Sequence, residues 1–220
     1  MRHAFSDRGE AGRALAQELA KLNLRAPVVL ALPRGGVPVG AEVARRLGAP
    51  LDLLLVRKIG VPWQPELAVA AVVDGQDQEL VIDEDTRAAT GVRRSYIEAQ
   101  AKEQTQEIER RRHLYLGDRT PISVEDRSAI VVDDGIATGT SMRAALKALR
   151  RRKPAMLVLA VPVAPHDTIE ALRGEVDRVV CLAEPEPFYA VGAHYDDFHQ
   201  VEDDEVMATL ADLGPPQPSQ

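Results

Sequence analysis

The sequence predicts an α/β fold with a doubly wound, mostly parallel sheet, and two observations carry that prediction. Short apolar runs alternate with segments of helical periodicity along most of the chain, which is typical of consecutive βαβ units. The runs at 27–33 and 129–132 are continuously apolar, as expected of strands that helices cover on both faces. A chain of 220 residues is within the usual range of one domain, so we expect a single domain over 1–220.

Two helices and two strands are expected before residue 60. The helices are indicated by apolar residues at helical spacing: Leu15, Leu19 and Leu22 in the first, and Val39, Val43 and Leu47 in the second. The first strand, over 27–33, is followed by the glycine pair 35–36. The second strand is expected over 51–56 and would end at the basic pair 57–58.

Residues 60–127 interrupt this alternation, and we expect them to form an inserted mobile segment. Two strands over 67–73 and 79–82, joined by the turn Asp74-Gly75-Gln76-Asp77, predict a hairpin. A long polar helix is expected over about 90–113, with few apolar residues along one side. We expect the arginines of this helix to lie on a solvated face.

Strict alternation of strands and helices resumes after the insertion. The expected strands are 129–132, 155–163 and 178–182, and the expected helices are 141–150 and 166–173. The next segment, about 184–205, is rich in aromatic and acidic residues, and we expect it to form a C-terminal lid, the hood. A closing helix runs to Leu213, where Gly214-Pro215-Pro216 ends it.

The composition is that of an ordinary globular protein, with 45% hydrophobic and 28% charged residues. The formal net charge of −7 argues against a nucleic-acid or membrane partner. The first residues, MRHAFSDRGE, contain no apolar run, and no stretch is long enough to span a bilayer. We therefore expect a cytoplasmic protein. The single cysteine, Cys181, fits a reducing compartment and is expected to be a buried strand thiol.

The stretch from Val131 to Ser141 is the most informative part of the chain. A buried strand delivers Asp133 and Asp134 to the carboxyl edge of the sheet, where open α/β folds bind ligands. The loop that follows is small or hydroxylated and leads into a helix, so its backbone amides would converge on one phosphate. Those amides belong to Ala137, Thr138, Gly139, Thr140 and Ser141.

Two adjacent acids suit a vicinal diol, because each carboxylate accepts a hydrogen bond from one hydroxyl. A phosphate and a diol on one ligand describe a ribose 5-phosphate. Asp-Asp-Gly alone would be read as an ordinary turn, but the whole strand–acid pair–loop–helix unit favours a binding site. No GxxxxGK[ST] sequence is present, so a Walker-type nucleotide site is not supported.

Residues 131–141, VVDDGIATGTS, resemble the phosphoribosyl diphosphate (PRPP) binding motif of type I phosphoribosyltransferases. The stretch 32–36, LPRGG, resembles the pyrophosphate loop of that family, and 57–58 resembles the basic pair before its mobile catalytic loop. PFYAVG at 187–192, followed by YDDF at 195–198, is similar to the base-binding hood of purine-type members. The resemblance implies the type I phosphoribosyltransferase fold and a Mg²⁺-dependent displacement of pyrophosphate from ribose C1′ by a nitrogenous acceptor.

Together, the residues and the resemblance suggest three groups of site residues. Asp133 and Asp134 would hold the ribose diol and, through ribose or water, the metal, while the amides of 137–141 would hold the 5-phosphate. The pyrophosphate would be met by Gly35, Gly36, Arg57, Arg34 and Lys58, of which Arg34 and Lys58 are expected to be catalytic. The acceptor would be met by Phe188, Tyr189, Val191, Gly192 and Asp196, the last also a candidate metal ligand. Relatives often have a cis peptide at the position of Pro33–Arg34.

One residue departs from the family pattern. Relatives specific for 6-oxopurines have an aspartate, the proposed general base, where this chain has Ala137, so we expect hypoxanthine and guanine to be poor acceptors. A second hypothesis is a PRPP-binding regulatory module with little or no transferase activity, although the negative charge disfavours a nucleic-acid target. A third is a different PRPP user, such as a hydrolase. The resemblance also implies a homodimer.

Overall fold

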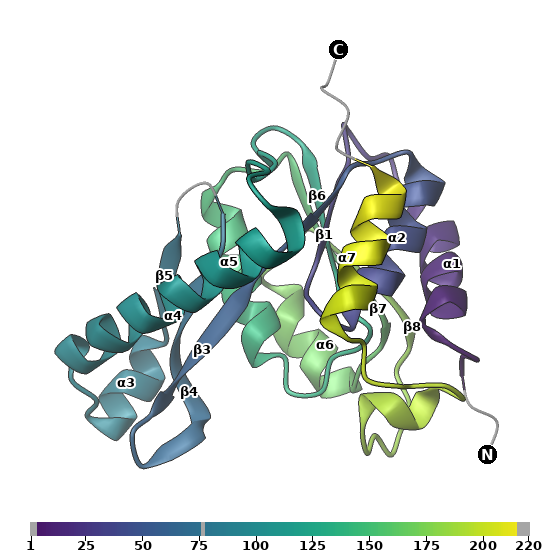
Figure 1. Ribbon diagram of the computed structural model, residues 1–220. Helices are drawn as coiled ribbons and strands as arrows, with labels where there is room; N and C mark the ends of the chain where they lie inside the picture. The colour runs from purple at the N-terminus through teal and green to yellow at the C-terminus, as the bar shows by residue number, and fades with distance from the viewer. Residues whose placement is uncertain (1–3, 76–77, 215–220) are drawn as a thin grey trace.

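The computed structural model describes residues 4–75 and 78–214 and contains two sheets with helices packed around them (Figure 1). The larger sheet has five strands in the order β2-β1-β6-β7-β8, and every neighbouring pair is parallel. Its strands are β1 (Val28–Ala31), β2 (Leu51–Leu53), β6 (Ser128–Val132), β7 (Met156–Val163) and β8 (Arg178–Ala183).

Helices cover both faces of this sheet, which confirms the predicted doubly wound fold. One face packs against α1 (Arg8–Leu19), α2 (Gly36–Leu47) and α7 (Asp203–Leu213), and the other against α5 (Thr140–Arg151) and α6 (His166–Arg173). Alternate residues of β6 enter different apolar clusters: Ile130 and Val132 face α1 and α2, whereas Ala129 and Val131 face α5. This two-sided burial is why the strand is continuously apolar.

A second, antiparallel sheet begins at Val56, before the predicted start of the inserted segment at 60, and is followed by two helices. The sheet consists of β3 (Val56–Val61), β4 (Gln64–Val73) and β5 (Glu79–Ile82), and the helices are α3 (Glu84–Thr90) and α4 (Arg94–Leu116). In Figure 1 these elements extend to the left of the parallel sheet. The predicted hairpin of β4 and β5 is confirmed, although Gln76 and Asp77 of its turn lie outside the described residues, as do Pro215 and Pro216. The sequence reading missed α3, and the mobility of the insertion remains a prediction.

The prediction of one strand over 51–56 is wrong, because the chain changes sheets inside it. The parallel strand β2 ends at Leu53, and the basic pair 57–58 lies within β3 rather than after a parallel strand. The amide of Leu54 still donates to Ala31 of the first sheet (2.9 Å), whereas the carbonyl of Leu55 accepts from Asp74 beside the second (2.8 Å). Both leucine side chains are buried, so the apolar run continues through the change and conceals it.

The prediction that the arginines of α4 are solvated is wrong for Arg112. Its side chain is only 12% exposed and donates to Asp74 Oδ2 (2.6 Å) and to Asp52 Oδ1 (3.1 Å). Asp52 lies on β2 and also accepts from the amide of Ile122 (2.8 Å), and Asp74 follows β4. One buried arginine therefore joins the inserted segment to the parallel sheet.

Candidate active site

The strand order places a candidate ligand crevice between β1 and β6. From β1 the chain crosses to β2 on one side, and from β6 it crosses to β7 on the other. Ligands of open α/β sheets bind outside the carboxyl ends of the strands at such a reversal. The two loops concerned, 32–36 and 133–139, begin side by side, because the amide of Leu32 donates to the carbonyl of Val132, the last residue of β6 (2.9 Å).

The glycine pair lets the two loops approach closely. A Cβ at Gly36 would lie 2.8 Å from the carbonyl oxygen of Val132, and a Cβ at Gly35 would overlap the carboxylate of Asp134. Any other residue at Gly36 would push the two loops apart, and any other residue at Gly35 would displace the carboxylate of Asp134. The peptide bond Pro33–Arg34 is cis, as the resemblance implied.

Asp133 and Asp134 form a compact, partly buried acid pair at the end of β6. The amide of Asp134 donates to Asp133 Oδ1 (2.9 Å), and the side chain of Asp134 is 13% exposed. Burial, together with the neighbouring charge of Asp134, raises the pKa of Asp133 well above its ordinary value. Burial also raises the pKa of Asp134, although the hydrogen bond from Arg8 opposes this. The acid pair therefore presents carboxylate oxygens that water solvates only in part and that can accept hydrogen bonds from a ligand.

The loop after the acid pair leads into α5 through Gly139, which has a φ of 72°. A side chain is disfavoured in this left-handed conformation, and a Cβ would lie 2.9 Å from Thr168 Cγ2. No side chain caps the N-terminus of α5, so the amides of its first turn are free to bind an anion. Thr168 of α6 fixes the loop from outside by donating to the carbonyl of Ala137 (2.9 Å).

A cavity of about 180 Å³ lies between this loop and the hairpin of the inserted segment. Its walls are formed by Thr138–Thr140, by residues of β4 and β5, and by Arg143 and Lys147 of α5. The two cations lie three and seven residues after Thr140 and share one face of the helix. Asp83 also lines the cavity, and Arg143 donates to the carbonyl of Ala171 (3.1 Å), so the cations and an acid share the space beside the loop in which a phosphate is expected.

The structure separates the two basic residues of β3. Lys58 pairs with Ala71, which packs against α5 and lines the cavity, whereas Arg57 pairs with Val72, which packs on the α4 side. Neighbouring residues of a strand point to opposite faces. The side chain of Arg57 accordingly donates to Gln104 on α4 (3.0 Å), and only Lys58, which is exposed, is on the face turned toward α5.

Arg34 is engaged by acids at the start of α7. Its Nη1 lies 3.2 Å from Glu202 Oε2 and 3.4 Å from Asp203 Oδ1, and its side chain is 30% exposed. Asp203 also accepts from the hydroxyl of Tyr115 (2.6 Å). A phosphate that binds Arg34 must therefore replace or share these carboxylate contacts.

The hood rests on the acid loop through Tyr195. This side chain is buried and donates its hydroxyl to the carbonyl of Asp134 (2.6 Å), and burial raises its pKa. Val191 is so close to Gly135 that a Cβ on the glycine would overlap it. Phe188 is half-buried and stacks on His194 with ring centroids 5.3 Å apart.

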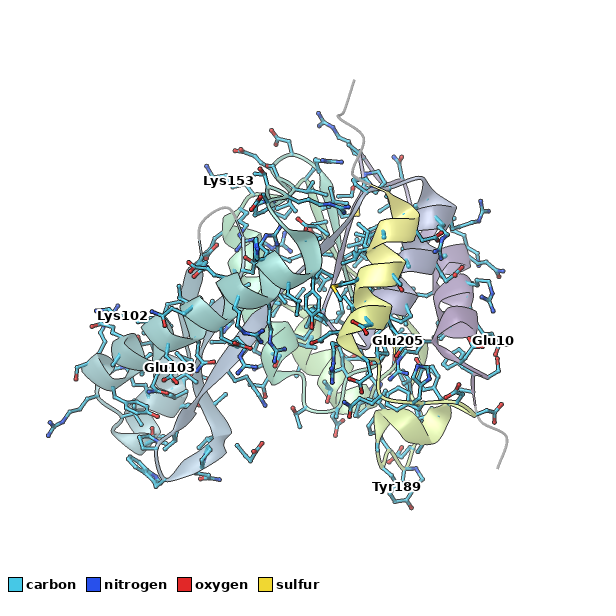
Figure 2. The ribbon with its side chains drawn as sticks, in the orientation of Figure 1. Glu10, Lys102, Glu103, Lys153, Tyr189 and Glu205 are labelled. Atoms are coloured by element: carbon cyan, nitrogen blue, oxygen red, sulfur yellow. The ribbon has the colours of Figure 1, made fainter. Side chains whose placement is uncertain are left out.

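The remaining hood candidates are less enclosed. Tyr189 is 80% exposed and lies at the outer edge of the molecule in Figure 2. The side chain of Phe198 would obstruct a Cβ at Gly192, so this glycine permits close packing within the hood. Asp196 is exposed, and within 4–75 and 78–214 no three His, Cys, Asp or Glu side chains are grouped as a metal site.

The sequence reading missed Arg8, which contacts Asp134 across 126 positions of the chain. Its side chain lies in the buried stripe of α1 with Ala11, Leu15 and Leu19. An arginine at the correct spacing to continue an apolar helix face is a signal that could have identified it.

Residues 7–197 match the family model of the phosphoribosyl transferase domain. Two curated proteins of Mycobacterium tuberculosis, from strains CDC 1551 / Oshkosh and H37Rv and each named "Putative phosphoribosyl transferase", are 48% identical over 206 residues. These matches cover 94% of this chain and 46% of each relative, so the chain spans about half their length. The crystal structure of TT1426 from Thermus thermophilus is 45% identical, with a TM-score of 0.85 over 97% of this chain and 99% of that one.

Proposed function

Because the chain belongs to the phosphoribosyl transferase domain family, we propose that it transfers ribose 5-phosphate from PRPP to a nitrogenous heterocycle with release of pyrophosphate. One observation carries this proposal beyond family membership. The acid pair of β6 and the glycine loop of β1 are in contact at the carboxyl edge of the sheet, so one ligand can touch both. PRPP has a diol for the acids and a diphosphate for the glycine loop.

In this proposal the ribose 5-phosphate half of PRPP occupies the β6 loop. Asp133 and Asp134 accept hydrogen bonds from the ribose hydroxyls. The amides from Ala137 to Ser141 and the N-terminus of α5 bind the 5-phosphate. Gly139 supports this role because its left-handed conformation turns the chain into the helix at that point.

The pyrophosphate half lies over the glycine loop. The amides of Gly35 and Gly36 and the side chains of Arg34 and Lys58 would neutralise the negative charge that develops on the leaving group. Arg57 would contribute only after leaving Gln104. Two partly buried carboxylates fit Mg²⁺, which is commonly held by one or two carboxylates and substrate phosphates. When bound, the ion would supply further charge neutralisation at the pyrophosphate.

We expect Lys58→Ala to lower kcat by about 100-fold while leaving PRPP affinity almost unchanged. Charge on the leaving pyrophosphate is larger in the transition state than in the bound substrate, so its cationic partner matters most there. Steady-state kinetics and a PRPP titration measure the two effects separately. Lys102→Ala, an exposed lysine on α4 shown in Figure 2, is the matched control. A raised KM with an intact kcat would show that Lys58 only binds.

The acceptor is proposed to be a flat heterocycle under the hood, near Phe188, Tyr189, Val191, Gly192 and Asp196. We expect Phe188→Ala or Tyr189→Ala to weaken acceptor use by roughly 1–3 kcal/mol, the value of stacking one base on an aromatic ring. Since Ala137 carries no base, hypoxanthine and guanine should be weak acceptors. Turnover across a panel of purines, pyrimidines and related heterocycles measures both effects. Efficient use of guanine would refute the argument from Ala137, and full activity of both variants would remove the hood from the acceptor site.

The alternative is a PRPP-binding regulatory module or another PRPP user. A pyrophosphate-release assay with PRPP, Mg²⁺ and the acceptor panel separates these functions. Acceptor-dependent release supports the transferase, acceptor-independent release supports a hydrolase, and binding without release supports the regulator. A homodimer in the cytoplasm remains part of the proposal and is tested by sedimentation and by localisation of the tagged protein. Among the described residues, no helix has the length and apolar character needed to cross a membrane.

A further inference from the structure

Arg8 stands at the start of α1, yet it is one of the most enclosed charged residues of the described chain, with 7% exposure. Its Nε donates to Asp134 Oδ2 (2.8 Å), and its Nη1 donates to the carbonyl of His199 (2.9 Å). The centre of its guanidinium group lies 3.8 Å from the centroid of the Phe198 ring. One side chain thus contacts both the acid pair and the hood.

Packing alone does not require an arginine here. Arg8 continues the buried stripe of Ala11, Leu15 and Leu19 on α1, where an apolar residue would avoid the cost of removing a charge from water. That cost is offset only because the guanidinium has a carboxylate, a carbonyl and an aromatic face as partners. Each of these partners belongs to the proposed site or to the hood that covers it.

The contacts of Arg8 extend to the rest of the hood. Phe198, under the guanidinium, packs against Gly192, and its ring lies 5.0 Å from that of Tyr195. Tyr195 in turn donates to the carbonyl of Asp134 (2.6 Å). Asp134 and the hood are therefore connected twice, once through Arg8 and once through Tyr195.

We propose that Arg8 is a positioning residue that fixes the Asp134 carboxylate for the ribose diol and holds the hood against it. The inference rests on the PRPP site proposed above. With Oδ2 of Asp134 bound to Arg8, rotation of the carboxylate is restricted, and Oδ1 is the oxygen presented to a ribose hydroxyl. Because the same guanidinium holds His199 and Phe198, a change at the ribose site is transmitted to the acceptor side.

The test compares a ligand that has the diol with one that lacks it. Dissociation constants for PRPP and for pyrophosphate, each with Mg²⁺, are measured by calorimetry for wild type, Arg8→Met, Arg8→Lys and Arg13→Met. Arg13 is an exposed arginine on the same helix and serves as the matched control. We expect Arg8→Met to weaken PRPP binding by roughly 10- to 100-fold, the effect of misplacing one charge-assisted hydrogen bond. Pyrophosphate binding should change less than about twofold, and Arg8→Lys should recover part of the loss.

The outcomes separate this inference from the proposed function. If wild type does not bind PRPP, both fail. If wild type binds and Arg8→Met weakens both ligands equally or neither, the positioning role is overturned and the PRPP site stands. Thermal melting accompanies each titration, and if Arg8→Met does not fold, Arg8→Lys makes the same comparison. If Arg8→Lys weakens PRPP binding but not pyrophosphate binding, the inference is supported. If its affinity for both ligands equals that of wild type, the inference is overturned.

Discussion

The double substitution Asp133→Asn and Asp134→Asn is expected to abolish nearly all PRPP affinity while the chain remains folded. Replacing two carboxylates that accept from a diol should remove on the order of 3–6 kcal/mol of binding free energy. This corresponds to a loss of roughly 10²- to 10⁴-fold in affinity. Burial raises the pKa of both acids, so neutral amides of nearly the same shape relieve part of the cost of two adjacent buried charges. Arg8 loses its charged partner at Asp134, and we therefore expect a lower melting temperature but a retained fold. The amide group that replaces the Asp134 carboxylate would still offer Arg8 an acceptor oxygen.

Calorimetric titration with Mg·PRPP measures this effect, and the melting temperature verifies the fold. Asp85→Asn with Asp118→Asn is the matched control, because it makes the same change in net charge at two exposed aspartates. A folded Asp133/Asp134 variant with wild-type affinity would exclude the acid pair from ribose binding. The control guards against a loss that comes only from a change in overall charge.

Substitution of Arg112 by alanine is expected to destabilise the protein by about 3–5 kcal/mol, the range seen when one partner of a buried ion pair is removed. Asp52 and Asp74, with side chains 5% and 3% exposed, would be left buried without their cation. For a domain of this size each kcal/mol lowers the melting temperature by roughly 2–4 °C. Because these three residues hold the inserted segment against the parallel sheet, we also expect the substitution to displace β3 and, with it, Lys58.

The pH dependence of this loss is a further check. Burial raises the pKa of Asp74, and Arg112 opposes the rise, so removing Arg112 should raise that pKa further. A group whose pKa is higher in the folded than in the unfolded protein makes the protein less stable as the pH rises from the unfolded-state pKa to the folded-state pKa. The destabilisation should therefore be smaller in acid than at neutral pH. Arg110→Ala, which removes an exposed arginine of the same helix, should leave the melting temperature nearly unchanged. Equal melting of both variants would contradict the role given to Arg112.

The central sheet and the acid loop could be predicted from the sequence because their signals are local. Each buried strand is a continuous apolar run, and the acid pair, the small loop and the following helix are consecutive residues. The predicted helix over 166–173 agrees with α6 for the same reason. That the glycine loop lies near Asp134 could be predicted, because both follow strands whose carboxyl ends meet at the same edge of the sheet. How closely the two approach could not be predicted.

The two buried arginines that were missed depend on pairs of residues far apart in the chain. Arg8 meets Asp134 across 126 positions, and Arg112 meets Asp52 across 60. Both arginines stand where they continue an apolar helix face, but no pattern along the chain identifies the distant acid that each one meets. The change of sheet after Leu53 was hidden for a different reason. Leu54 and Leu55, which connect the two sheets, are both buried, so the apolar run shows no break where the parallel strand ends.

The central claim is that PRPP binds where the β1 and β6 loops meet. Amide chemical-shift mapping of the wild-type protein titrated with Mg·PRPP tests it most directly. The account predicts saturable shifts concentrated at 32–36 and 133–141, with smaller shifts in the hood. Shifts concentrated elsewhere, or none at saturating PRPP, would contradict it.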